Sequence, residues 1–104
     1  MKRGEHPRHG LDTLINSPVR LSILAELIAI DGPEFRHVRD TVEITDSCLS
    51  KHITKLERSG YVAVRKGSVN GRPRTWLEIT PVGRRAYESH LAALEAIIDP
   101  TKRS

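Results

Sequence analysis

The chain is poor in cysteine, in aromatic side chains and in long apolar runs. Among its 104 residues there is one cysteine, Cys48, so no intrachain disulfide can form, which fits a reducing compartment. The longest apolar run, residues 21–30, is interrupted by Ser22 and Glu26 and falls short of the roughly 20 residues that span a bilayer. Residues 1–10 lack the apolar centre of a signal peptide. We therefore expect a cytoplasmic protein with no membrane segment.

The sequence also lacks the motifs of common catalytic and metal sites. It contains no glycine-rich phosphate loop, no HExxH, no GxSxG and no cluster of paired carboxylates. Its five histidines are scattered, and the pair His6 and His9 has no cysteine or carboxylate support for a metal ion. His52 is predicted to be a hydrogen-bonded structural histidine. We predict that the protein is not an enzyme and that it holds no metal and no cofactor.

Positive charge, in contrast, is concentrated in one third of the chain. Residues 47–85 contain nine basic and two acidic residues, a net charge of +7, whereas residues 1–46 carry −2 and residues 86–104 carry −1. Such a local excess of lysine and arginine is the usual footprint of a polyanion-binding face. It favours nucleic acid as a partner over a basic surface that is merely solvated.

Helix signals divide the first half of the chain. Residues 1–9 are charged and are predicted to form a flexible basic arm. A helix is predicted from Pro18 to about Ile30, because Ser17 can cap it and Asp31-Gly32-Pro33 stops it. A short helix is predicted over 34–41, and after a turn of about three residues a third helix follows, which Thr45 or Asp46 caps and which ends near Arg58. That spacing indicates a helix-turn-helix.

The third predicted helix has one apolar and one polar face. Leu49, Ile53 and Leu56 recur at helical spacing and are expected to face the core. The other face carries short hydrogen-bonding side chains and lysines, which is the combination that a helix in the major groove of DNA needs. The candidate DNA-recognition residues are Thr45, Asp46, Ser47, Ser50, Lys51, Thr54 and Lys55.

A basic hairpin follows this helix. Strands are predicted over 61–65 and 75–79, with Leu77 and Ile79 facing the core, and a loop over 66–74 that turns at Asn70-Gly71. Trp76 is expected to point outward, beneath the arginines of the hairpin or against the last helix. Basic residues near the tip have no core to serve, so they are predicted to contact the DNA backbone or minor groove. These residues are Lys66, Arg72 and Arg74.

The last predicted helix starts at Thr80-Pro81 and ends near Ile98, before a tail over 100–104. Its apolar stripe is longer than a monomer of this size should need, which predicts a two-fold dimer. The alternative is that the helix folds back onto its own core. The predicted dimer-interface residues are Leu11, Leu14, Ile15, Tyr87, Leu91, Leu94 and Ile98.

Three segments together resemble the winged-helix transcriptional regulators grouped near the MarR family: SPVRLSILAEL, FRHVRDTVEITDSCLSKHITKLERSGYVAVRK and GRPRTWLEITPVGRRAYESHLAALEAI. The resemblance implies an α+β, mainly helical fold. Residues 10–80 would form a winged helix-turn-helix, with a three-helix core and a two-stranded wing, and residues 81–99 a C-terminal dimerisation helix. The paired-cysteine motif of the related ArsR metal sensors is absent, so metal sensing is not implied.

The same resemblance implies a homodimer on a pseudo-palindromic operator of double-stranded DNA. The recognition helix would enter the major groove and the wing would lie on the backbone or minor groove. It leaves room for an unidentified small-molecule effector. The similar proteins often have Gly-Asn where Ser47-Cys48 stands here, so the base preference is expected to differ.

We therefore expect a sequence-specific DNA-binding transcriptional regulator, and two alternatives stay open. A winged helix that binds protein instead of DNA would expose apolar residues on the outer face of the third helix. A redox-responsive regulator would use Cys48, near a helix N-terminus whose dipole favours a thiolate. A lone cysteine is more often a small packing residue, and the chain holds no second cysteine to resolve an oxidised thiol.

Overall fold

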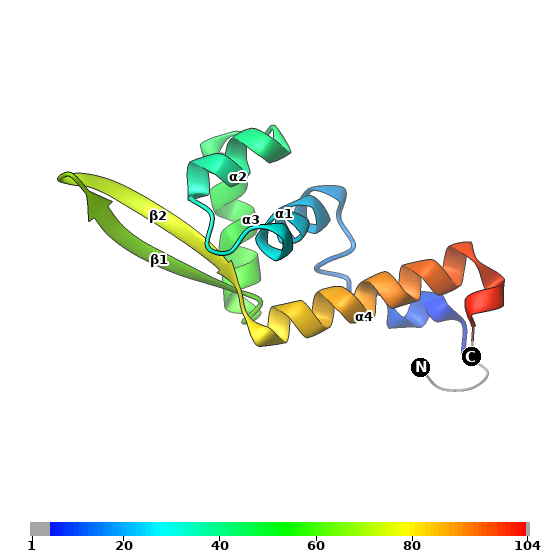
Figure 1. Ribbon diagram of the computed structural model, residues 1–104. Helices are drawn as coiled ribbons and strands as arrows, with labels where there is room; N and C mark the ends of the chain where they lie inside the picture. Colours follow the sequence, from blue (N-terminus) through cyan, green and yellow to red (C-terminus); the bar gives the residue numbers. More distant parts are fainter. Residues whose placement is uncertain (1–4, 104) are drawn as a thin grey trace.

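Helices predominate in the computed structural model, which describes residues 5–103 (Figure 1). Three helices form the body, a two-stranded hairpin projects from it, and a long helix leaves it in another direction. This is the predicted mainly helical winged helix-turn-helix with a C-terminal helix. The elements in chain order are the 3₁₀ helix η1 (Pro7–Gly10), α1 (Pro18–Ala29), α2 (Phe35–Val42), α3 (Asp46–Arg58), β1 (Val62–Val69), β2 (Arg72–Ile79), α4 (Pro81–Ile98) and η2 (Pro100–Lys102).

One apolar core joins the three-helix body to the base of the hairpin. Leu49, Ile53 and Leu56 of α3 are buried in it, as the helical spacing predicted, and so is Leu77 of β2. Ile15 is also fully buried there. The prediction that Ile15 contributes to a dimer interface is therefore wrong, because the turn before α1 directs this side chain into the core of its own chain.

Local sequence signals explain where the helices begin and end. The first turns of α1, α3 and α4 each donate a backbone N–H to the side-chain oxygen of the preceding residue, which is Ser17, Thr45 or Thr80. The turn between α2 and α3 contains no glycine, and Glu43 adopts the left-handed conformation there with φ of 61°. The helix-turn-helix therefore closes without the glycine often found at this position.

The hairpin is longer and more regular than predicted. Its antiparallel register runs from Val62 opposite Ile79 to Val69 opposite Arg72. Asn70 and Gly71 both have positive φ, 52° and 75°, as a two-residue hairpin turn requires. The predicted loop over 66–74 is thus wrong, because strand pairing continues to this turn.

The far half of α4 projects beyond the body and is accompanied by η1 and η2 (Figure 1). Pro7 of η1 is buried, so the expected flexible arm is wrong for residues 7–9, and residues 1–4 lie outside the described residues. The molecule measures 56 × 24 × 21 Å, and its radius of gyration of 15.5 Å exceeds the roughly 13 Å of a compact domain of this length. No helix within residues 5–103 is long and apolar enough to cross a bilayer.

A buried histidine links the N-terminal segment to α4. The His90 side chain is 1% exposed, and its Nδ1 accepts a hydrogen bond of 3.0 Å from the backbone N–H of Asp12. The ring is therefore neutral, and burial lowers the pKa of His90. His52 is confirmed as a hydrogen-bonded structural histidine, since its Nδ1 lies 3.2 Å from Nη1 of Arg20. Burial, together with the charge of Arg20, lowers the pKa of His52 as well.

Acid should destabilise the fold through these histidines. The unfolded chain binds protons at a histidine pKa near 6.5, above the lowered pKa values of the folded chain, so stability is present above about pH 6.5 and falls as the pH drops below it. We expect His90→Asn, which keeps an acceptor near Nδ1, to reduce the slope of the unfolding free energy against pH, measured by urea unfolding between pH 5 and 8. His52→Asn is the matched comparison and should remove a separate part of that slope. An unchanged slope in both variants would show that other groups set the acid sensitivity.

Candidate nucleic-acid interface

The predicted polar face of α3 is open to solvent. All seven candidate recognition residues are exposed, from Thr45 at the cap to Lys55 in the third turn of α3. The hydroxyl of Thr45 caps the helix by accepting from the N–H of Cys48 at 3.1 Å, and the hydroxyl of Thr54 donates to the carbonyl of Ser50 at 2.9 Å. Cys48 itself is partly buried. The seven candidate residues therefore present hydroxyls, lysines and one carboxylate.

A groove separates α3 from the hairpin. Its volume is about 300 Å³, and it brings Lys66 of β1 together with Ser50 and Thr54 of α3. The remaining residues of its lining are Phe35, Ile53, Glu57, Val64, Thr75 and Leu77. Helix α3 and the hairpin thus share one concave surface, which is lined by hydroxyl, lysine, carboxylate and apolar side chains.

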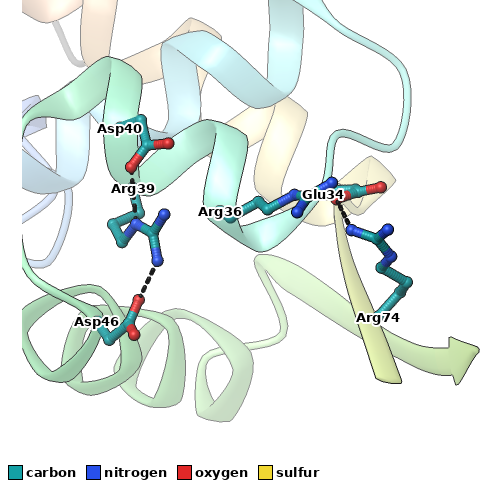
Figure 2. A network of polar contacts seen from close by, with 6 residues as sticks. All are labelled: Glu34, Arg36, Arg39, Asp40, Asp46 and Arg74. Atoms are coloured by element: carbon teal, nitrogen blue, oxygen red, sulfur yellow. Dashed lines mark hydrogen bonds and ion pairs between the residues drawn. The ribbon is translucent and has the colours of Figure 1, made fainter. Parts of the chain in front are cut away.

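The three predicted wing cations have different surroundings. Lys66 and Arg72 are exposed, and Arg72 stands next to the turn. The Arg74 side chain is only 22% exposed, and its Nη1 lies 3.4 Å from Oε2 of Glu34 (Figure 2). The expectation that Arg74 has nothing to hold within its own chain is wrong, because it ties the hairpin to the start of α2. Arg72 and Lys66 remain the candidates for free contact with DNA.

Trp76 lies under a cation of the hairpin. The guanidinium carbon of Arg65 on β1 is 4.3 Å from the centre of the Trp76 ring on β2, a distance typical of a cation–π contact. Trp76 thus packs beneath an arginine of the hairpin, but this arginine is Arg65 of β1 and not Arg72 or Arg74 of the predicted wing tip. Strand pairing sets this contact, since Arg65 and Trp76 stand directly opposite each other.

Two arginines on α2, which the sequence did not place at the site, stand beside it (Figure 2). Arg36 Nε donates to Glu34 Oε2 at 2.8 Å. Arg39 donates from Nε to Asp40 and from Nη1 to Asp46, both at 2.8 Å. Those hydrogen bonds raise the pKa of Arg39, and the one to Asp40 lowers the pKa of that carboxyl. The net charge of residues 1–46 is −2, so charge counting did not point to α2.

The predicted dimer-interface residues fall into two groups. Leu14 and Tyr87 pack against the core of their own chain, as the alternative reading of α4 proposed. Leu91, Leu94 and Ile98 form an apolar stripe on the projecting half of α4, in which the first two are partly buried and Ile98 is 78% exposed. Leu11, which lies in the segment before α1, is also partly buried. For these residues the interface stays a prediction.

Comparisons with known proteins agree with this geometry. Residues 19–98 match the family model described as winged helix DNA-binding domain. The chain is 36% identical over 78 residues to an uncharacterised protein, MJ0432, of Methanocaldococcus jannaschii, covering 75% of this chain and 85% of that protein. A solved transcriptional regulator homologue from Pyrococcus horikoshii OT3 is 32% identical with a TM-score of 0.81, over 90% of this chain and 94% of that one.

A more distant solved structure shares the fold. It is a MarR-family transcriptional regulator from Silicibacter pomeroyi, 24% identical, with a TM-score of 0.65 over 95% of this chain and 66% of that one. The four-helix arrangement with a two-stranded wing is therefore common to this chain and to a MarR-family regulator.

Proposed function

The chain belongs to the winged-helix DNA-binding domain family, and from this premise we propose that it is a regulator that binds specific sequences of double-stranded DNA as a homodimer. The observation that carries the proposal is the exposed polar and basic face of α3 beside the groove that contains Lys66. A helix of this kind presents base-reading groups, while exposed cations on a wing meet phosphates. A protein-binding module would need apolar residues where this face carries hydroxyls and lysines.

Homodimerisation is supported by the shape of the monomer. The projecting half of α4 carries the stripe Leu91, Leu94 and Ile98, and Ile98 is 78% exposed in the single chain. Pairing two copies through this stripe would bury apolar surface that one chain leaves in water. A two-fold dimer would place two α3 helices in successive major grooves, about 34 Å apart.

Selection of bound duplexes from a random pool tests the proposal. The expected result is a motif with two inverted half-sites whose centres lie about 10 base pairs apart, as two-fold symmetry requires. The affinity for that duplex should fall steeply with salt, since phosphate contacts release counterions. Recovery of no motif, or binding that stays flat across a salt titration, would contradict the proposed function.

Arg72→Ala should weaken binding to every duplex to a similar degree. Arg72 is exposed beside the turn of the wing, where a phosphate contact carries no sequence information. Loss of one such contact per chain should lower the slope of log affinity against log salt by about 2 in a dimer. Arg8→Ala is the matched control, because Arg8 is exposed on η1, at the far half of α4. Equal salt slopes for the parent and both variants would remove Arg72 from the interface.

A further inference from the structure

A carboxylate, Asp46, stands at the N-terminal end of the face of α3 that is proposed to meet DNA, whereas Glu57 lies in the last turn of α3 and lines the groove beside the hairpin. Asp46 is the first residue of α3, and its side chain is 71% exposed. DNA phosphates repel a carboxylate in this position, so it weakens binding unless it meets a hydrogen-bond donor on a base. An acidic residue also suits the positive end of the helix dipole, but any orientation of the side chain would satisfy that.

The orientation of Asp46 is in fact constrained by α2 (Figure 2). Arg39 Nη1 donates to Asp46 Oδ1 at 2.8 Å, while Arg39 Nε donates to Asp40 Oδ1 at 2.8 Å. Asp40 thereby anchors a guanidinium whose planar donors fix the direction of the second carboxylate. Oδ1 of Asp46 takes one bond, and the rest of this exposed carboxylate can accept others.

From this geometry, and on the premise of the proposed function, we infer that Asp46 is a specificity-determining residue that accepts a hydrogen bond from the N4 amino group of a cytosine in the major groove, with Arg39 as its positioning residue. Among the bases, guanine and thymine offer acceptors in that groove. Adenine places its N7 acceptor beside its amino group, where it repels the second carboxylate oxygen. Cytosine presents a donor with no neighbouring acceptor, and acidic side chains are the usual partners of that group.

The inference predicts an effect opposite to that of a phosphate contact. Removing the carboxylate should relax the base preference at one position of each half-site, by about 10-fold. The same change removes a negative charge from the DNA face, so affinity for unrelated duplexes should stay equal or rise. A purely structural role at the start of α3 would change thermal stability and would leave the base preference intact.

The experiment uses the full chain and the duplex that the parent selects, with all four bases placed in turn at each half-site position. Asp46→Ala should lose the preference for cytosine at one position only, and Asp46→Asn should shift it towards adenine, which asparagine pairs through N6 and N7. Arg39→Ala should weaken the same preference without moving it. Asp40→Ala removes the anchor of Arg39 and should weaken the same preference to a smaller degree. Asp31→Ala is the control, because it removes an exposed carboxylate outside α2 and α3, and it should leave the preference for cytosine unchanged.

The outcomes separate this inference from the function on which it rests. A parent that selects a motif, together with an Asp46→Ala variant that reads every position as the parent does, would overturn the role of Asp46 and leave the proposed function standing. A parent that selects no motif would overturn both. Thermal melting of each variant shows whether the fold is kept, and because Thr45 still caps α3, we expect melting close to that of the parent.

Discussion

Replacing Gly83 with alanine should destabilise the fold by about 3 kcal/mol, although alanine is the better helix former. Gly83 is buried in the first turn of α4, and a Cβ at this position would lie 2.1 Å from the carbonyl oxygen of Tyr61 and 2.8 Å from its carbonyl carbon. These are backbone atoms, which cannot rotate away. The gain in helix propensity is at most about 1 kcal/mol, so the clash decides the sign.

The clash at Gly83 would disturb the junction between residues 60–61 and the start of α4. The Tyr61 carbonyl accepts the backbone N–H of Thr80 at 3.0 Å, and the Thr80 hydroxyl donates to the carbonyl of Gly60. Relief of the clash requires α4 to move away from this junction, which strains both bonds and changes the direction in which α4 leaves the body. Gly83 therefore serves the placement of α4 as well as its packing.

Urea or thermal unfolding of Gly83→Ala measures the effect, and we expect the melting temperature to fall by more than about 10 °C. Gly67→Ala is the matched control. Its Cβ would meet only the Trp76 ring, at 3.0 Å, on an exposed stretch of the hairpin, so a change within about 1 kcal/mol is expected. A Gly83→Ala protein that melts at or above the parent would show that the junction yields more easily than its contacts imply.

The helices could be predicted from the sequence because residues at or next to their ends determine where each helix begins and ends. Thr45 and Thr80 cap the helices that follow them, and Gly60 has the positive φ of 78° expected just beyond α3. The predicted bounds of the last helix, 81–98, are those of α4, and the predicted end near Arg58 is that of α3, for which Thr45 rather than Asp46 is the cap. The strands were predicted too short, because the composition of residues 66–74 is that of a loop and only pairing across the hairpin extends them.

In the candidate site, too, some features follow from the local sequence and others only from tertiary packing. Helical periodicity was enough to place the exposed face of α3, since burial of Leu49 and Ile53 determines what points outward. The pairing of Arg74 with Glu34, 40 residues earlier, depends on how the hairpin folds against α2, and no local pattern reports it. The burial of Ile15 and the contact between Gly83 and Tyr61 are likewise products of tertiary packing.

Replacing both Leu94 and Ile98 with glutamate should convert the proposed dimer to a monomer and weaken DNA binding by at least about 100-fold. The two residues lie one helical turn apart on the projecting half of α4, and Ile98 is 78% exposed in the single chain. Charges placed there would face like charges across a two-fold axis and would lose the apolar contact. A monomer engages one half-site at a time, so the gain from linking two recognition helices disappears.

Sedimentation equilibrium measures the mass of this double variant, and titration of the selected duplex measures its affinity. Ala92→Glu is the matched control, because Ala92 is exposed on α4 about 120° around the helix from Ile98. It adds one negative charge per chain, half that of the double variant, to another face and should leave the dimer and its DNA affinity near those of the parent. If the double variant stays dimeric, another surface joins the two chains. If it becomes monomeric and binds the full duplex as tightly as the parent, the spacing of two recognition helices contributes nothing to affinity.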